Sequence, residues 1–409
     1  MLILQKNGYG VTGRISFREI SSALTTGCWF ARFIFSLIPQ SAFCIPKYYN
    51  TMSIVARRKK TRQISIGGVK IGGGAPITVQ SMTNTFTHDV GATVAQIHRL
   101  EAVGCELVRV AVPDQAAAEA IASIKKKISI PLIADIHFDY RLAMAAMKAG
   151  ADGLRINPGN IGAARKVEAV AKEAMKQGIP IRVGVNAGSL EKDLLKKHGG
   201  VTPQAMVESA LRHVKLLRSY DFHEIKVSIK ASDVLRTVEA YRLLSSRTDI
   251  PLHVGVTEAG SLFSGTVKSA LGIGILLAEG IGDTIRVSLT RDPVDEVRVG
   301  YEILKGLKIR QRGPEIVSCP TCGRCEIDLV EIVERVESAL LTMTTPVQLA
   351  IMGCVVNGPG EAREADIGIA GGKGHGVLFK KGKVIRKVPE DRLVEVLLKE
   401  VEKYESVGD

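Results

Sequence analysis

The sequence lacks the features that would assign it to a membrane or disulfide-rich secreted class. Its longest apolar run, residues 28–46, is interrupted by Arg32 and Pro39 and makes a poor membrane span. Its 7 cysteines are odd in number and gather toward one end, which argues against a disulfide framework and for a reducing compartment. We therefore expect a cytoplasmic protein with no membrane segment, long enough at 409 residues for a large domain and a small one.

Aromatic residues are also scarce, at 5% with a single tryptophan, although the formal net charge is +13. The basic excess is concentrated between residues 53 and 311. A nucleic-acid surface usually carries Lys and Arg in runs with interleaved aromatic residues. Here many arginines stand singly at the ends of apolar segments, which favours a buried anionic ligand and no nucleic acid.

The first 51 residues differ from the rest, because they hold Trp29, contain few acids and precede a second methionine, Met52. Three hypotheses compete: a gene start set too far upstream, a basic targeting segment, or a structural extension. We treat residues 1–55 as an N-terminal extension and assign no chemistry to it.

Eight short segments rich in β-branched residues alternate with stretches of helical periodicity from Pro76 onward. Most begin roughly 22 to 33 residues apart, as successive βα units do. They predict a (β/α)₈ TIM-type barrel over residues 56–311. The competing fold, a doubly wound open sheet, usually has a glycine-rich turn after its first strand, and this sequence has none there. The predicted strands are residues 77–82, 106–112, 131–136, 153–157, 180–185, 224–229, 251–256 and 284–289.

Charged and polar side chains end these strands, where the chemistry of such barrels is located. Residues two apart on a strand share a side, so Asp135 and His137 can face one cavity. One arginine here could simply pair with a neighbouring acid. Four arginines and a lysine are costly to bury unless anionic groups meet them, and guanidinium fits phosphate. We therefore expect a substrate with more than one phosphoryl group. The set comprises Arg109, Asp135, His137, Arg155, Asn157, Arg182, Asn186, Lys230, Ser232, Thr257, Glu258, Arg286 and Ser288.

Glu258 is the one acid of this set that is followed by Ala259 and Gly260. It could act as a proton donor or base, or it could pair with Arg182 or Arg286. Basic neighbours favour its ionised form and desolvation favours its neutral form.

A different pattern begins at residue 312 and predicts a small α+β domain over residues 312–409. Two loops rich in Pro and Gly carry Cys319, Cys322, Cys354 and Glu361. A structural zinc site of four thiolates, with Cys325 as the fourth, is one hypothesis. An iron–sulfur cluster held by three thiolates and an exchangeable Glu361 is another, and unligated thiols are a third.

Long motifs in order closely resemble those of the bacterial 4-hydroxy-3-methylbut-2-enyl diphosphate synthase family, from about Thr61 to Leu398. The resemblance implies a barrel joined to a [4Fe–4S] domain, in a homodimer whose barrels each face the partner's cluster. It implies the reductive opening of 2-C-methyl-D-erythritol 2,4-cyclodiphosphate, with loss of water, on electrons from flavodoxin or ferredoxin in the methylerythritol phosphate route to isoprenoids. The motifs are residues 79–85, 134–141, 154–162, 181–194, 226–233, 255–260, 279–289, 318–324 and 352–362.

The resemblance also suggests a role for each site residue. Glu258 would be the acid that protonates or positions the departing oxygen, and Glu361 the labile fourth cluster ligand beside Cys319, Cys322 and Cys354. The diphosphate-binding cations would be Arg109, Arg155, Arg182, Lys230 and Arg286. Further substrate contacts would come from Asp135, His137, Asn186, Thr257 and Ser288.

Two features depart from the family pattern, namely Cys325 and residues 1–55. The chain lacks the large insertion of plant-type members, so we expect the two-domain bacterial form. Two alternatives stay open on the residues alone: a non-redox phosphate-binding barrel with a zinc-stapled domain, and a basic RNA-binding protein with a zinc module.

Overall fold

The computed structural model describes residues 55–354 and 362–405. The hypotheses about residues 1–51 and about Glu361 lie outside this part of the chain. Within it, no helix is both long and apolar enough to cross a membrane.

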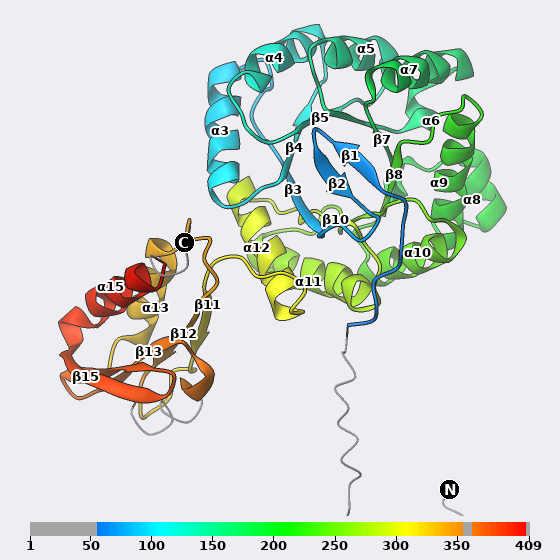
Figure 1. Ribbon diagram of the computed structural model, residues 1–409. Coiled ribbons are helices and arrows are strands. Elements are labelled where there is room, and N and C mark those ends of the chain that lie inside the picture. Colours follow the sequence, from blue (N-terminus) through cyan, green and yellow to red (C-terminus); the bar gives the residue numbers. More distant parts are fainter. Residues whose placement is uncertain (1–54, 355–361, 406–409) are drawn as a thin grey trace, which may run out of the picture. The chain divides into compact units, whose positions relative to one another are not determined.

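The predicted barrel is confirmed, because eight parallel strands form one sheet in the order β8-β7-β6-β5-β4-β3-β10-β9 (Figure 1). A bridge between Val227 and Leu252 joins the two end strands and nearly closes the ring. The strands are β3 (Thr78–Met82), β4 (Leu107–Ala111), β5 (Leu132–Asp135), β6 (Gly153–Ile156), β7 (Ile181–Asn186), β8 (Ile225–Lys230), β9 (His253–Val254) and β10 (Thr284–Ile285).

Helices surround this sheet and bury its outward-facing apolar residues (Figure 1). Several begin at an aspartate whose carboxylate accepts a hydrogen bond from a backbone N–H of the first turn, as Asp114 does from Ala117 at 2.8 Å. The helices are α3 (Val90–Ala102), α4 (Gln115–Lys125), α5 (Tyr140–Lys148), α6 (Pro158–Ile161), α7 (Ala164–Gln177), α8 (Lys192–His198), α9 (Pro203–Arg218), α10 (Val234–Arg247), α11 (Leu262–Ala278) and α12 (Pro293–Gly306).

A short hairpin of β1 (Ile64–Ile66) and β2 (Val69–Ile71) covers the end of the barrel where the strands begin. Its isoleucines pack against Leu107 and Ile133 on the inner side of β4 and β5. At its turn, Gly67 has a positive φ of 52° and lies against Pro131 and Asp152, which precede β5 and β6. The hairpin therefore closes this end of the barrel with apolar side chains and leaves the opposite end for a ligand.

The long interval before β8 holds two helices, α8 and α9. The last two strands of the barrel are shorter than the sequence predicts, at two residues each. At the end of the predicted last strand, the N–H of Leu289 donates to the Glu296 carboxylate at 3.1 Å.

The C-terminal part is the predicted α+β unit, built on a five-stranded mixed sheet in the order β11-β12-β13-β14-β15. The first three strands are parallel and the last three antiparallel. The sequence analysis missed β11, a short and largely exposed strand. The elements are β11 (Glu315–Ser318), α13 (Leu329–Ala339), β12 (Gln348–Met352), β13 (Ile367–Gly372), β14 (His375–Lys380), β15 (Lys383–Pro389) and α15 (Leu393–Glu405).

Candidate functional site

A polar cavity of about 260 Å³ lies where the barrel strands end. It brings together all ten side chains that the sequence analysis proposed as substrate contacts, from seven of the eight strands or the loops that follow them. Met82 and Ser228, which the sequence analysis did not name, also line it. The lining residues are Met82, Arg109, Asp135, His137, Arg155, Arg182, Asn186, Ser228, Lys230, Thr257, Arg286 and Ser288.

Asp135 at the end of β5 holds two of the cavity arginines. Its carboxylate lies 3.1 Å from Arg155 Nη1 and 3.6 Å from Arg109 Nε, and His137 Nε2 lies 3.4 Å away. Burial opposes ionisation of this carboxyl, but Arg109, His137 and Arg155 outweigh burial and hold its pKa well below the usual range. Asp135 is therefore an anion that orients two cations at once.

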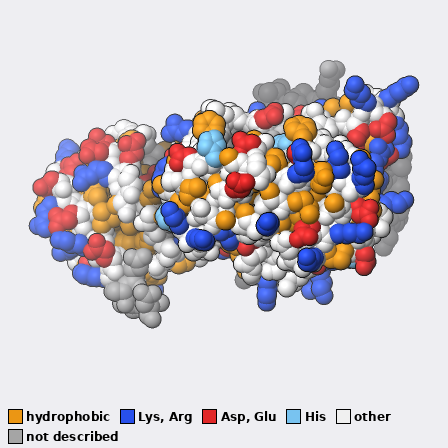
Figure 2. Space-filling view, turned by 90° about the horizontal axis from the view of Figure 1, so that it is seen from above, with side chains coloured by type: hydrophobic (Ala, Val, Ile, Leu, Met, Phe, Trp, Pro, Cys, Tyr) orange, Lys and Arg blue, Asp and Glu red, His pale blue; other side chains and the backbone are white. Residues whose placement is uncertain are grey.

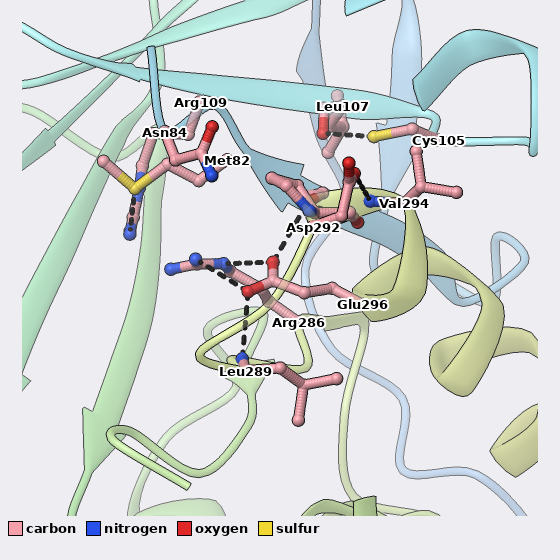
Figure 3. Close-up of polar contacts among 12 residues, drawn as sticks. Met82, Asn84, Cys105, Leu107, Arg109, Arg286, Leu289, Asp292, Val294 and Glu296 are labelled. Carbon is pink, nitrogen blue, oxygen red and sulfur yellow. Dashed lines mark hydrogen bonds and ion pairs between the residues drawn. The ribbon is translucent and has the colours of Figure 1, made fainter. Parts of the chain in front are cut away.

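Arg286 is held by a second acid, Glu296, which projects from the first turns of α12 (Figure 3). Its Nε and Nη2 each lie 3.4 Å from a Glu296 carboxylate oxygen. At the upper left of the same view, Arg109 donates to the Met82 sulfur at 3.0 and 2.8 Å. A thioether is a weak acceptor, so Arg109 remains able to exchange it for a ligand oxygen.

Arg182 and Lys230 have no carboxylate within ion-pair distance among the described residues. Both are buried, at 4% and 8% exposure. The Nε and Nη1 of Arg182 have no hydrogen-bond partner in the described part. Burial, followed by the other cations of the cavity, lowers the pKa of both groups well below their usual values. Because a guanidinium keeps its charge in proteins, this site is electrostatically unsatisfied and would be stabilised by an anion.

Two glycines, Gly184 inside β7 and Gly255 directly after β9, make room for cations of the cavity. A Cβ on Gly184 of β7 would lie 2.5 Å from Arg155 Nε, and a Cβ on Gly255 would lie 2.7 Å from Lys230 Nζ. The sequence analysis missed both, although a glycine within a strand often marks a close approach of another group. It also missed Glu296, for which the sequence gives no distinct signal because the residue lies in an ordinary helical turn.

Glu258 occupies the loop after β9 and is exposed, outside the set that lines the cavity. Its backbone φ is 52°, an unusual value for a residue other than glycine. The adjacent Thr257 does line the cavity, so Glu258 lies at its rim. The alternative pairing with Arg286 is wrong in this structure, because Arg286 pairs with Glu296.

The outer surface contrasts with the cavity. On the face drawn in Figure 2, basic and acidic side chains are interspersed with hydrophobic ones. Some of the basic residues pair with acids, as Arg62 does with Asp249 at 2.7 Å. Inside the cavity, by contrast, Arg182 and Lys230 are buried and have no ion pair among the described residues.

The cysteine loops leave neighbouring parallel strands of the C-terminal sheet, β11 and β12, which pair Ser318 with Ile351. Cys319 and Cys354 therefore lie just beyond the carboxyl ends of adjacent strands. The N–H of Gly353 donates to the Cys319 sulfur at 3.2 Å. Cys322 is exposed. Within residues 55–354 and 362–405, no three His, Cys, Asp or Glu side chains are close enough to hold one metal ion. The loops therefore bring soft donors to the same end of the sheet, but the described residues do not form a complete set of metal ligands.

Cys325 is placed differently from the other loop cysteines. Its thiol donates to the Ile327 carbonyl at 3.3 Å, and its side chain packs against the core of the C-terminal unit. A Cβ on Gly353 would lie 2.5 Å from its sulfur, so the two residues are in close contact.

Comparison with known proteins agrees with this architecture. The GcpE TIM-barrel domain model matches residues 61–301, and the GcpE protein C-terminal domain model matches residues 315–403. A crystal structure of Yersinia pestis dihydropteroate synthase, at 12% identity and a TM-score of 0.44 over 60% of this chain and 97% of its own, is too distant to bear on function.

Curated relatives match the chain over almost their entire length. A Geobacter sulfurreducens protein is 62% identical over 85% of this chain and 98% of its own. A Lawsonia intracellularis protein is 61% identical over 85% and 97%, and a Thermodesulfovibrio yellowstonii protein 59% identical over 85% and 99%. All three are named 4-hydroxy-3-methylbut-2-en-1-yl diphosphate synthase (flavodoxin). The chain therefore belongs to the GcpE family of 4-hydroxy-3-methylbut-2-en-1-yl diphosphate synthases.

Proposed function

We propose that this enzyme converts 2-C-methyl-D-erythritol 2,4-cyclodiphosphate to 4-hydroxy-3-methylbut-2-en-1-yl diphosphate in the methylerythritol phosphate route to isoprenoids. The reaction consumes two electrons and two protons, opens the ring at a carbon–oxygen bond and releases one water. The observation that supports this proposal most directly is a pair of buried cations, Arg182 and Lys230, that form no ion pair with an acid in the described part of the chain. A diphosphate supplies the charge that they lack.

Different cavity residues are proposed to make different contacts with the substrate. Arg182 and Lys230 would neutralise the diphosphate most directly, since no carboxylate among the described residues lies within ion-pair distance of either. Arg109, Arg155 and Arg286 are already oriented by Asp135 and Glu296, and they present guanidinium N–H groups to phosphoryl oxygens. Asn186, Thr257 and Ser288 add hydrogen bonds from the same cavity. Holding the substrate by its diphosphate fixes the position of the ring carbons.

Glu258 is proposed as the acid that delivers a proton to the departing oxygen. It lies at the rim, beside Thr257, where it can reach a substrate that fills the cavity. Glu258→Gln should lower kcat by about 10²- to 10⁴-fold, the usual contribution of a general acid, with little change in KM. Unchanged kcat in this variant would remove the proposed role.

For the metal centre, we propose a [4Fe–4S] cluster held by Cys319, Cys322, Cys354 and Glu361. The donor chemistry fits, because thiolates on two loops at one sheet edge suit a soft iron centre. When bound, such a cluster passes electrons singly to the substrate. Cys325 is not included, since its side chain packs into the core and donates to a backbone carbonyl.

Flavodoxin is the proposed electron donor, with ferredoxin as the alternative carrier. We further propose a homodimer in which the barrel of one subunit faces the cluster domain of the other. The cysteine usage supports a reducing, cytoplasmic setting for this chemistry.

Anaerobic purification tests the proposal in two steps. The protein should be brown, contain iron and sulfide in equal amounts, and turn over the cyclic diphosphate with reduced flavodoxin. A colourless protein with zinc and no iron would instead support a non-redox phosphate-binding barrel with a structural zinc domain. Binding to RNA that weakens steeply with salt, without any effect of the cyclic diphosphate on Tm, would support an RNA-binding protein.

A further inference from the structure

Glu296 is a buried acid whose side chain is directed toward the cavity without lining it. It belongs to the first turns of α12, is 4% exposed, and meets the Nε and Nη2 of Arg286 at 3.4 Å each (Figure 3). These are long contacts for a guanidinium–carboxylate pair. They use two of the five N–H groups of Arg286 and leave the other three for a ligand.

The same carboxylate is fixed from two other directions. Ser81 of β3 donates its hydroxyl hydrogen at 3.0 Å, and the backbone N–H of Leu289 donates at 3.1 Å. Leu289 directly follows Ser288, a cavity residue, so one carboxylate restrains both Arg286 and the backbone that carries Ser288. Glu296 therefore connects α12, β3 and the loop after β10 at a single point.

The negative charge of Glu296 opposes the repulsion between Arg286 and the other cations of the cavity. Arg286 shares the cavity with Arg109, Arg155, Arg182 and Lys230, and like charges repel one another. Asp135 restrains Arg109 and Arg155 from one side of the cavity. For Arg286, the only carboxylate within ion-pair distance in the described residues is Glu296. Without that carboxylate, Arg286 would be pushed outward by the other cations.

We propose that Glu296 is a positioning residue that sets Arg286 and Ser288 at the correct distance for one phosphoryl group of the substrate. This inference rests on the proposed function, because it assumes a diphosphate in the cavity. Glu296 touches neither substrate nor reacting atoms, and it acts through Arg286 and the Leu289 backbone.

The test is Glu296→Gln in the cluster-loaded enzyme. The amide keeps the shape of the side chain. Its single oxygen can still accept from the Leu289 N–H, and its NH2 group can donate to the Ser81 hydroxyl oxygen, but it no longer carries the charge that restrains Arg286. We expect KM for the cyclic diphosphate to rise by about 10- to 100-fold, as misplacement of a binding group does, while kcat changes by only a few-fold. The Kd for inorganic diphosphate should rise in parallel, with iron content and visible absorbance unchanged.

Glu302→Gln provides the matched control, because Glu302 lies on the same helix, is mostly exposed and pairs only with Lys305. It should leave KM and Kd within about two-fold of the parent, the scatter expected of a surface substitution. Equal KM and Kd in Glu296→Gln and the parent would overturn the inference, and so would a loss confined to kcat.

A double-mutant cycle tests whether the effect runs through Arg286. With Arg286→Met already present, adding Glu296→Gln should raise KM no further, and independent effects that multiply would contradict the inference. If Glu296→Gln fails to fold, Glu296→Asp keeps the charge but retracts it, and a KM equal to that of the parent would again be contradictory. Failure of the proposed function is distinct from all of these outcomes, because then the parent itself would neither turn over the cyclic diphosphate nor bind it.

Discussion

The two halves of the candidate active site are built by different means. In the barrel, the charged side chains project from strands and are fixed by acids and glycines before any ligand arrives, as Arg155 is by Asp135 and Gly184. In the C-terminal unit, the cysteines lie on loops, and the described residues do not gather three metal donors in one place. The fold determines the first half directly, whereas the second half, as proposed, would depend on a bound metal to complete the ligand set.

The difference lies in what opposes assembly. Burying several like charges is unfavourable, and only a closely packed barrel holds them together. Thiolates need no such enforcement, because the metal–sulfur bonds supply the energy that draws the loops together. Substitutions should therefore affect the two halves in opposite ways. In the barrel, loss of a cation should raise the stability of the ligand-free protein. In the loops, loss of a thiol should remove the bound metal.

The largest effect is expected for Cys354→Ser. Loss of one thiolate should remove most of the iron and the visible absorbance, and flavodoxin-driven turnover should fall below detection. Cys325→Ala is the control. Because Cys325 packs against the core, this variant should keep its iron. Iron and sulfide analysis of both variants, purified anaerobically, gives the measurement. Full iron in Cys354→Ser would show that the ligand set is wrong, and loss of iron in Cys325→Ala would favour a set of four thiolates that includes Cys325.

Arg182→Met tests the opposite behaviour in the barrel. Arg182 is buried and forms no ion pair within residues 55–354 and 362–405. Its removal should therefore cost at least about 100-fold in kcat/KM, or about 3 kcal/mol of transition-state stabilisation. The same change should raise the Tm of the ligand-free protein by roughly 2–4 °C, since a buried unpaired charge is replaced by an apolar side chain of similar length.

Inorganic diphosphate sharpens this test. It should raise the Tm of the parent and leave the Tm of Arg182→Met almost unchanged, so that the order of the two melting temperatures reverses or the gap closes. Calorimetric melts with and without diphosphate measure this. A lower Tm for ligand-free Arg182→Met would mean that the arginine is structurally satisfied, contrary to the unpartnered Nε and Nη1.

How far the sequence predicts this site differs between the two halves. The strand spacing places Arg109, Asp135 and Arg286 at strand ends, so the barrel and the members of its cavity can be predicted together. Glu296 cannot, because its position depends on how α12 folds back against β3, which is a tertiary contact between residues far apart in sequence. In the loops, the cysteine spacing indicates a metal site but does not show which cysteine packs into the core instead of facing the metal. The close contact between Cys325 and Gly353 identifies Cys325 as the cysteine that packs into the core.

Gly184→Ala should have a smaller effect, since it keeps every charged group. The added methyl would lie 2.5 Å from Arg155 Nε, so the guanidinium must shift and its contact with Asp135 must change. We expect KM to rise by about 10-fold and the protein to lose about 1–3 kcal/mol of stability through overpacking. Gly274→Ala on α11 is the control, because no heavy atom lies within 4 Å of its added Cβ. Steady-state kinetics and denaturant melts compare the two, and equal KM values would show that Arg155 tolerates displacement.

The smallest effect on turnover is expected outside the cavity, at the contact between Glu191 and His213, whose carboxylate oxygen and Nε2 lie 3.1 Å apart. Burial opposes ionisation of Glu191, but the polar groups of His213 and Ser209 nearby outweigh it and lower its pKa to about 2. Because the folded pKa lies below the usual value of about 4.3, this carboxylate stabilises the fold above that pH, and the contribution is lost as the pH falls toward 2.

Glu191→Gln should therefore lower the free energy of unfolding by about 1–2 kcal/mol at pH 7, with the deficit disappearing between about pH 4.3 and 2. Its KM and kcat should match the parent, because the residue lies outside the cavity lining. Urea melts across this pH range measure the first effect and kinetics at pH 7 the second. A stability deficit that is the same at every pH would mean that the glutamine disturbs packing instead of removing a charge. A raised KM would show that residues outside the cavity lining also help to position the diphosphate.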